Sequence, residues 1–192
     1  MFQRFGEKIK IVEFDCVLTS AEENLVKSCS HNFSHVSFSG NDSCTQELWN
    51  FLKINPHIES LTVSSDTLGV LPFKHTWVDL ELPKLESLSV SGYQIMDDIM
   101  NMTKLGTILE LDLHACEIAE NILLQIANQC PRLQTLDLSN MRTKPITDGT
   151  LGAFASSCPF IVELNIFASR GITDIVILNV VQRIARFEHY RG

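Results

Sequence analysis

Apolar residues recur along the chain at a spacing that predicts one short strand after another. In Leu133-x-x-Leu136-x-Leu138, the last two leucines are two positions apart and therefore share one face of a strand. Polar residues alternate with them and point to the other face. The steps between successive groups are 22 to 28 positions, so the pattern predicts seven similar units. Their middle apolar residues are Phe14, Val36, Leu61, Leu88, Leu111, Leu136 and Leu164.

Helical spacing between the predicted strands returns further apolar residues to the same core. Thr147 and Thr173 each precede such a run, where a Thr can cap a helix and the Asp that follows is favoured by the helix dipole. Residues 66–83 depart from this pattern, and Pro72 predicts a broken helix with a loop there. The other helices are predicted over residues 22–29, 45–54, 95–104, 121–129, 148–157, and from 174 to at least 187.

One strand–helix unit cannot bury its own apolar face, so the units must stack on one another. We therefore predict an α/β fold, a right-handed solenoid with a parallel sheet on its concave side and helices on its convex side. A single domain is expected over residues 1–192: a weak N-terminal repeat or cap at 1–30, repeats at 31–181 and a C-terminal cap at 182–192. Its core is expected to bury Leu111, Leu113, Leu136, Leu138, Leu164 and Ile166.

Composition and charge narrow the class of protein. A chain with 45% hydrophobic and 20% charged residues is typical of a folded domain. No apolar run approaches the roughly 20 residues that cross a bilayer, and the N-terminus lacks the apolar core of a signal peptide. We expect a cytoplasmic protein, with the nucleus as the alternative. The net charge of −8 argues against nucleic-acid and anionic-membrane partners.

The six cysteines include no Cys-x-x-Cys pair, so a zinc site is not expected. We expect reduced, mostly buried thiols in an intracellular protein. Three Asn-x-Ser/Thr sequons, at Asn32, Asn41 and Asn101, favour the alternative of a secreted chain. Because a secretory signal is missing, we attribute these sequons to chance.

Asp112, His114 and Cys116 form the local candidate for catalysis. Asp112 and His114 should share one strand face, whereas Cys116 should turn inward after the strand, where a thiol is inert. We interpret this group as an exposed His beside a structural Cys. No glycine-rich phosphate loop or metal-ligand spacing is present either, so we expect no enzymatic activity, no cofactor and no metal.

The polar face of the predicted sheet is a better candidate for function. Its 21 alternating positions contain no Lys or Arg, although the chain has 15 of these residues. Clustered carboxylates favour a protein partner with a basic segment, and we expect a monomer outside that complex. An ordinary solvated sheet face is the alternative. The expected partner-binding residues are Glu110, Asp112, His114, Thr135, Asp137, Ser139, Glu163, Asn165 and Phe167.

The motif Cys-Pro-x-Leu-x-x-Leu-x-Leu at Cys130, with the later Ile-Thr-Asp, resembles the cysteine-containing class of leucine-rich repeat. A looser copy begins at Cys158, and the family's second cysteine is matched by Cys116. That class is familiar from F-box proteins and their relatives, where the repeats serve as substrate receptors of ubiquitin ligases.

The resemblance implies a non-enzymatic protein–protein interaction module, used as a substrate-recognition or adaptor subunit in ubiquitin ligation. The alternative is a structural or assembly-factor protein of the same repeat class, or a fragment of a longer one, with no role in ubiquitination. The sequence contains no F-box ahead of the repeats, so we expect that recruitment of a ligase would need another chain.

Overall fold

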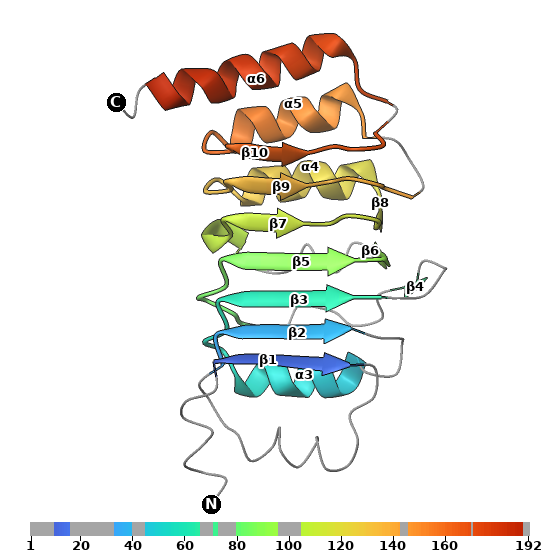
Figure 1. The fold of residues 1–192 in the computed structure, drawn as a ribbon, viewed down its shortest axis with the longest axis vertical. Helices are drawn as coiled ribbons and strands as arrows, with labels where there is room; N and C mark the ends of the chain where they lie inside the picture. Colours follow the sequence, from blue (N-terminus) through green and yellow to red (C-terminus); the bar gives the residue numbers. More distant parts are fainter. Residues whose placement is uncertain are drawn as a thin grey trace, which may run out of the picture.

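The computed structural model describes residues 10–15, 33–39, 45–65, 71–72, 80–95, 105–142, 146–169 and 171–189. These residues form an α/β fold in which a seven-stranded, all-parallel sheet alternates with helices (Figure 1). The predicted helix over residues 22–29 and most of the one over 95–104 lie outside the described residues.

The main sheet contains one strand from each of the seven predicted units, in the order of the sequence. Each strand pairs in parallel with the next, and equivalent residues are in register, as for Leu111, Leu136 and Leu164. Apolar side chains alternate with polar ones, as in β3, where buried Leu61 and Val63 alternate with partly buried Ser and Thr residues. The seven strands are β1 (Ile11–Asp15), β2 (His35–Ser39), β3 (Ser60–Ser64), β5 (Ser87–Ser91), β7 (Glu110–Asp112), β9 (Thr135–Asp137) and β10 (Glu163–Asn165).

A second, three-stranded sheet was not predicted. Its order is β4 (Leu71–Pro72), β6 (Tyr93–Ile95) and β8 (Glu117–Ile118), all parallel. The prediction of a broken helix over residues 66–83 is wrong where β4 lies, and the prediction of a helix from residue 95 is wrong at Ile95. Pro72 is tolerated because β4 is an edge strand, where a missing N–H costs little.

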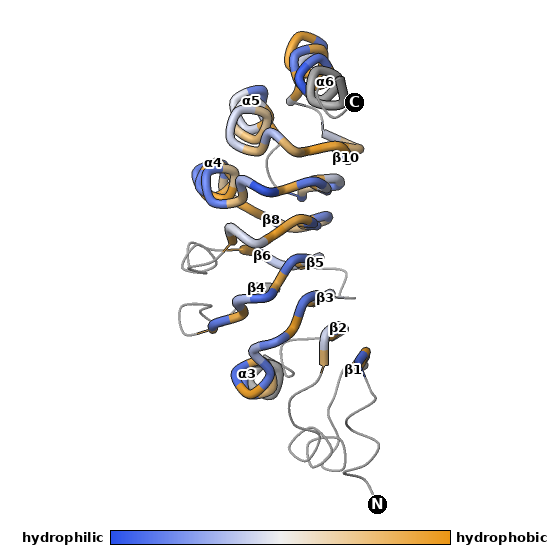
Figure 2. The backbone as a smooth tube through the Cα atoms, turned by 90° about the vertical axis from the view of Figure 1, so that its left-hand side faces the viewer, coloured by the Kyte–Doolittle hydropathy of each residue, from blue (hydrophilic) through white to orange (hydrophobic). Residues whose placement is uncertain are grey.

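The helices among the described residues are α3 (Thr45–Ile54), α4 (Glu120–Gln129), α5 (Asp148–Ser157) and α6 (Asp174–His189), and the same residues include the 3-10 turn η4 (Leu105–Thr107). All four agree with the predicted helices to within two residues. Thr147 caps α5 as expected, because its hydroxyl accepts a hydrogen bond from the Thr150 N–H at 3.2 Å. Helices α3, α4 and α5 lie on one side of the main sheet (Figure 2). We call the opposite side of this sheet the open face.

The core lies between the main sheet and the helices. Leu111, Leu113, Leu136 and Leu138 are 0–3% exposed, which confirms their prediction. Leu164 and Ile166 were predicted to be buried, but they are only partly buried. The physical reason is their position, because they belong to the unit of β10, the last strand of the sheet, and no described strand covers its outer edge.

A residue with left-handed backbone conformation follows each of four strands of the main sheet. These residues are Gly92, Ala115, Asn140 and Ala168, with φ between 55° and 78°. Each one redirects the chain out of the sheet. Glycine is required at the first of these turns, since a Cβ on Gly92 would lie 2.7 Å from the carbonyl oxygen of Ser65.

Candidate binding surface on the main sheet

The last three strands bring the predicted site residues together in rows across the open face. Pairing of β7 with β9 and of β9 with β10 aligns Glu110, Thr135 and Glu163 in one row. Because neighbouring strands stand about 4.8 Å apart, the ends of this row are roughly 10 Å apart. The next row is Asp112, Asp137 and Asn165, and the residues two positions later are His114, Ser139 and Phe167.

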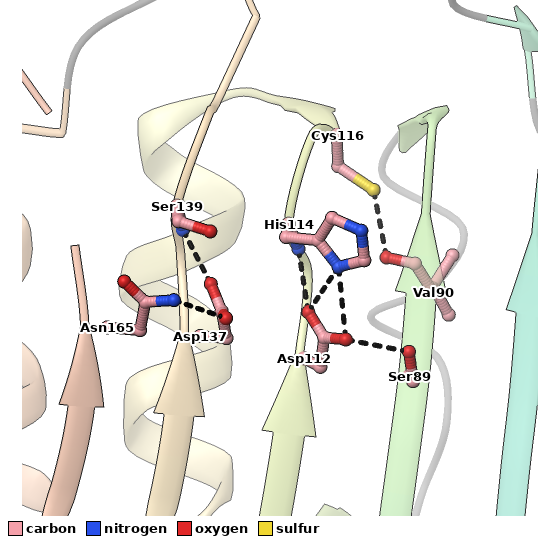
Figure 3. Close-up of polar contacts among 8 residues, drawn as sticks. All are labelled: Ser89, Val90, Asp112, His114, Cys116, Asp137, Ser139 and Asn165. Atoms are coloured by element: carbon pink, nitrogen blue, oxygen red, sulfur yellow. Dashed lines mark hydrogen bonds and ion pairs between the residues drawn. The ribbon is translucent and has the colours of Figure 1, made fainter. Parts of the chain in front are cut away.

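The middle row forms one repeated turn, shown in part in Figure 3. In each unit, a side-chain oxygen accepts a hydrogen bond from the backbone N–H of the residue two positions later. Asp112 accepts from His114 at 2.9 Å and Asp137 accepts from Ser139 at 2.8 Å. Asn165 accepts from Phe167 in the same way at 3.1 Å. Such bonds close a turn with an Asp or Asn side chain. This row therefore has a structural role that the sequence analysis missed.

Lateral hydrogen bonds join the same side chains from strand to strand. The Ser89 hydroxyl donates to Asp112 at 2.9 Å, and the Asn165 amide donates to Asp137 at 2.7 Å. Neutral donors therefore already occupy both oxygens of each of these two carboxylates. These carboxylates would attract a cationic partner through long-range electrostatics rather than by accepting new hydrogen bonds from it.

The His114 ring is held by the carboxylate of its own strand. Its Nδ1 lies 2.8 Å and 3.1 Å from the two oxygens of Asp112. The ring is 43% exposed, so its other nitrogen can reach solvent or a partner. This arrangement orients an imidazole as a hydrogen-bonding group on the open face (Figure 3).

The Cys116 thiol points into the core, as predicted. Its Sγ donates to the carbonyl oxygen of Val90 at 3.0 Å, and the residue is fully buried. Burial raises the pKa of the thiol to about 12. Cys130 and Cys158 are also buried, and burial raises their pKa values to about 12 and about 11. The other three cysteines lie outside the described residues.

Four of the nine predicted residues are exposed. They are Glu110, Glu163, Asn165 and Phe167, and Phe167, at the end of the surface, is 73% exposed. Ser139, by contrast, was predicted on the open face and is buried, at 4% exposure. It lies in the turn just before the left-handed Asn140, where the strand alternation no longer applies.

Within the described residues, no group of three or more His, Cys, Asp or Glu could hold a metal ion. The same part of the chain contains no helix that is both long and apolar enough to cross a membrane. No protein-family model matches the chain, and no curated protein matches it. The fold and this surface therefore define an α/β protein with a parallel sheet and an acidic, partly aromatic area on its open face.

Proposed function

We propose that this chain is a non-catalytic protein-binding module that holds a basic segment of its partner on the open face of the main sheet. One observation carries the proposal. No described helix covers this face, and none of the described residues predicted to lie on it is Lys or Arg. A face that carries acidic side chains and no Lys or Arg favours a partner of opposite charge.

The finer fold proposal is a leucine-rich-repeat solenoid of the cysteine-containing class, with the open face as its concave wall. Three observations support it: in-order parallel strands, the recurring left-handed turn after the strand, and buried Cys130 and Cys158 directly after α4 and α5. Solenoids of stacked repeats commonly bind partners along their concave walls.

Glu110 and Glu163 would make the closest contacts with a cationic partner. Both carboxylates are exposed, and no side-chain hydrogen bond to either is found among the described residues. Their separation of roughly 10 Å is close to the Debye length of about 8 Å at physiological salt. A single Lys or Arg placed between them is therefore attracted by both carboxylates. Phe167 offers apolar contact at the far end of the same surface.

The test begins with partner identification by affinity purification and mass spectrometry. The purified partner is then measured by surface plasmon resonance at two salt concentrations. We expect Glu110→Lys with Glu163→Lys to slow association at least tenfold and to weaken its salt dependence. A matched control, Glu59→Lys with Glu86→Lys, reverses two exposed carboxylates that precede the strands. Equal association rates for the two double variants would place binding elsewhere.

A role as a substrate-recognition or adaptor subunit in ubiquitin ligation rests on the repeat resemblance. In that role the open face would hold the substrate, and a separate chain would bind the ligase. Co-purification of a ligase subunit, together with accumulation of the partner when this chain is depleted, would support the role. A stable complex without either effect would favour the structural or assembly-factor alternative.

A further inference from the structure

Every unit of the main sheet is joined to the next by the same backbone hydrogen bonds. The carbonyl oxygen before each strand accepts two N–H groups from the following unit, as Gln134 does from Val162 and Glu163 at 2.9 and 3.1 Å. After the strand, N–H groups donate onward, as Leu138 does to Asn165 at 2.9 Å. The same carbonyl role recurs at Lys10, Ser34, Glu59, Glu86 and Leu109.

The outer edge of β10 presents these groups without partners among the described residues. Register makes Val162 equivalent to Gln134, Ile166 to Leu138, and Ala168 to Asn140. The carbonyl of Val162 and the N–H groups of Ile166 and Ala168 are thus placed to pair with one more parallel strand. An edge of this kind is a template for strand addition.

The helix layer also leaves groups without packing partners among the described residues at this end, because α6 exposes apolar side chains on its outer side. Gly152 and Ala155 of α5 line the groove against α6. Counted from the first residue of each helix, their equivalents in α6 are Leu178 and Val181, which are 58% and 55% exposed. In all, seven of the nine exposed large apolar residues that the structure describes lie between residues 160 and 181. A final repeat that ended the stack would need a polar outer side.

A third set of contacts links the starts of successive helices. Thr147, which caps α5, donates its hydroxyl to Glu120, the first residue of α4. Thr173, before α6, donates its N–H and hydroxyl to Asp148, the first residue of α5, at 2.8 and 2.6 Å. The next acceptor in this series is Asp174, which is exposed and whose carboxylate has no hydrogen-bond partner among the described residues.

We infer that the end formed by β10 and α6 binds a strand–helix segment of another protein, which docks as one further repeat. Its strand adds in parallel to β10, its helix packs on Leu178 and Val181, and a Thr or Ser at the start of that helix donates to Asp174. A two-fold dimer of this chain does not fit, because symmetry would pair the two β10 strands antiparallel and lose the parallel register.

The probe is a synthetic peptide of residues 130–161, which carries β9, α5 and the cap Thr147. It is labelled and titrated with the full chain under reducing conditions, with fluorescence anisotropy and far-ultraviolet circular dichroism as readouts. We expect one-to-one binding with a gain of helical signal. A peptide with Leu136→Pro, which cannot pair as a strand, should bind at least tenfold more weakly, and Thr147→Val several-fold more weakly.

On the chain, Leu178→Lys should weaken peptide binding at least tenfold. Asn121→Lys adds the same charge at an exposed site on α4, within the stack, and should leave binding unchanged. Both variants are first shown by thermal melting to be folded. Absence of binding at about 1 mM peptide, equal binding by both variants, or sedimentation of the chain alone as a dimer that Leu178→Lys dissociates would each overturn the inference.

Discussion

Replacing Leu136 with Ala tests whether the stacked sheet is held by packing between units. Leu136 is 0% exposed and lies in register between Leu111 and Leu164. Removing its outer carbon atoms loses roughly 2 kcal/mol of transfer free energy, at about 0.8 kcal/mol per buried CH₂. Neighbouring strands on both sides prevent collapse of the space, so the cavity term adds to this loss. We expect a total cost of about 3–5 kcal/mol.

The same substitution at Leu164 is the matched comparison. Leu164 occupies the equivalent position of the next strand but is only partly buried, and its outer side is open. We expect Leu164→Ala to cost less than about 2 kcal/mol, because less area is lost and the space can fill with solvent. Urea unfolding followed by circular dichroism measures both. Equal costs at the two positions, or a cost below about 1 kcal/mol for Leu136→Ala, would refute this account of the packing.

Three further predictions follow from single contacts. Gly92→Ala should destabilise the protein by more than about 1 kcal/mol in the same assay, because the new Cβ meets the Ser65 carbonyl at a positive φ. Hydrogen bonds from Thr173 lower the pKa of Asp148 below 3.8, so its stabilising contribution is full above about pH 4 and is lost as the pH falls through the folded-state pKa; the stability gap between wild type and Asp148→Asn should therefore shrink between pH 5 and pH 2. Thiol labelling at pH 8 should be slow until the protein unfolds for Cys116, Cys130 and Cys158, and rapid modification of any of the three in the native protein would contradict its burial.

The main sheet could be predicted because its signal is repeated seven times. An error at one unit is corrected by the others, and the spacing alone placed all seven strands. The three-stranded sheet has no such redundancy: β4 and β8 contain two residues each, which is too short for a period of two to be recognised. Strand β6 also ends at Ile95, where a helix was predicted to begin, so local propensity indicated the wrong structure there.

Burial at the ends of the stack could not be predicted from the repeat pattern. The pattern assigns Leu164 the same role as Leu136, because both occupy the middle position of x-Leu-x. Exposure depends on whether another unit follows, which is a property of the neighbours rather than of the motif. The exposed Leu178 and Val181 show the same effect in the helix layer.

The candidate site shows why a carboxylate on a strand cannot be assigned to binding from its type alone. Asp112 and Asp137 are on the predicted face, yet each closes the turn that follows its strand. Asn165 does the same at the equivalent position without a charge, so the turn requires an acceptor oxygen rather than an anion. Reversal of either aspartate would therefore change the turn and the surface potential together. Glu110 and Glu163 carry charge without that second role, so the effect of their reversal on association reports on the partner alone.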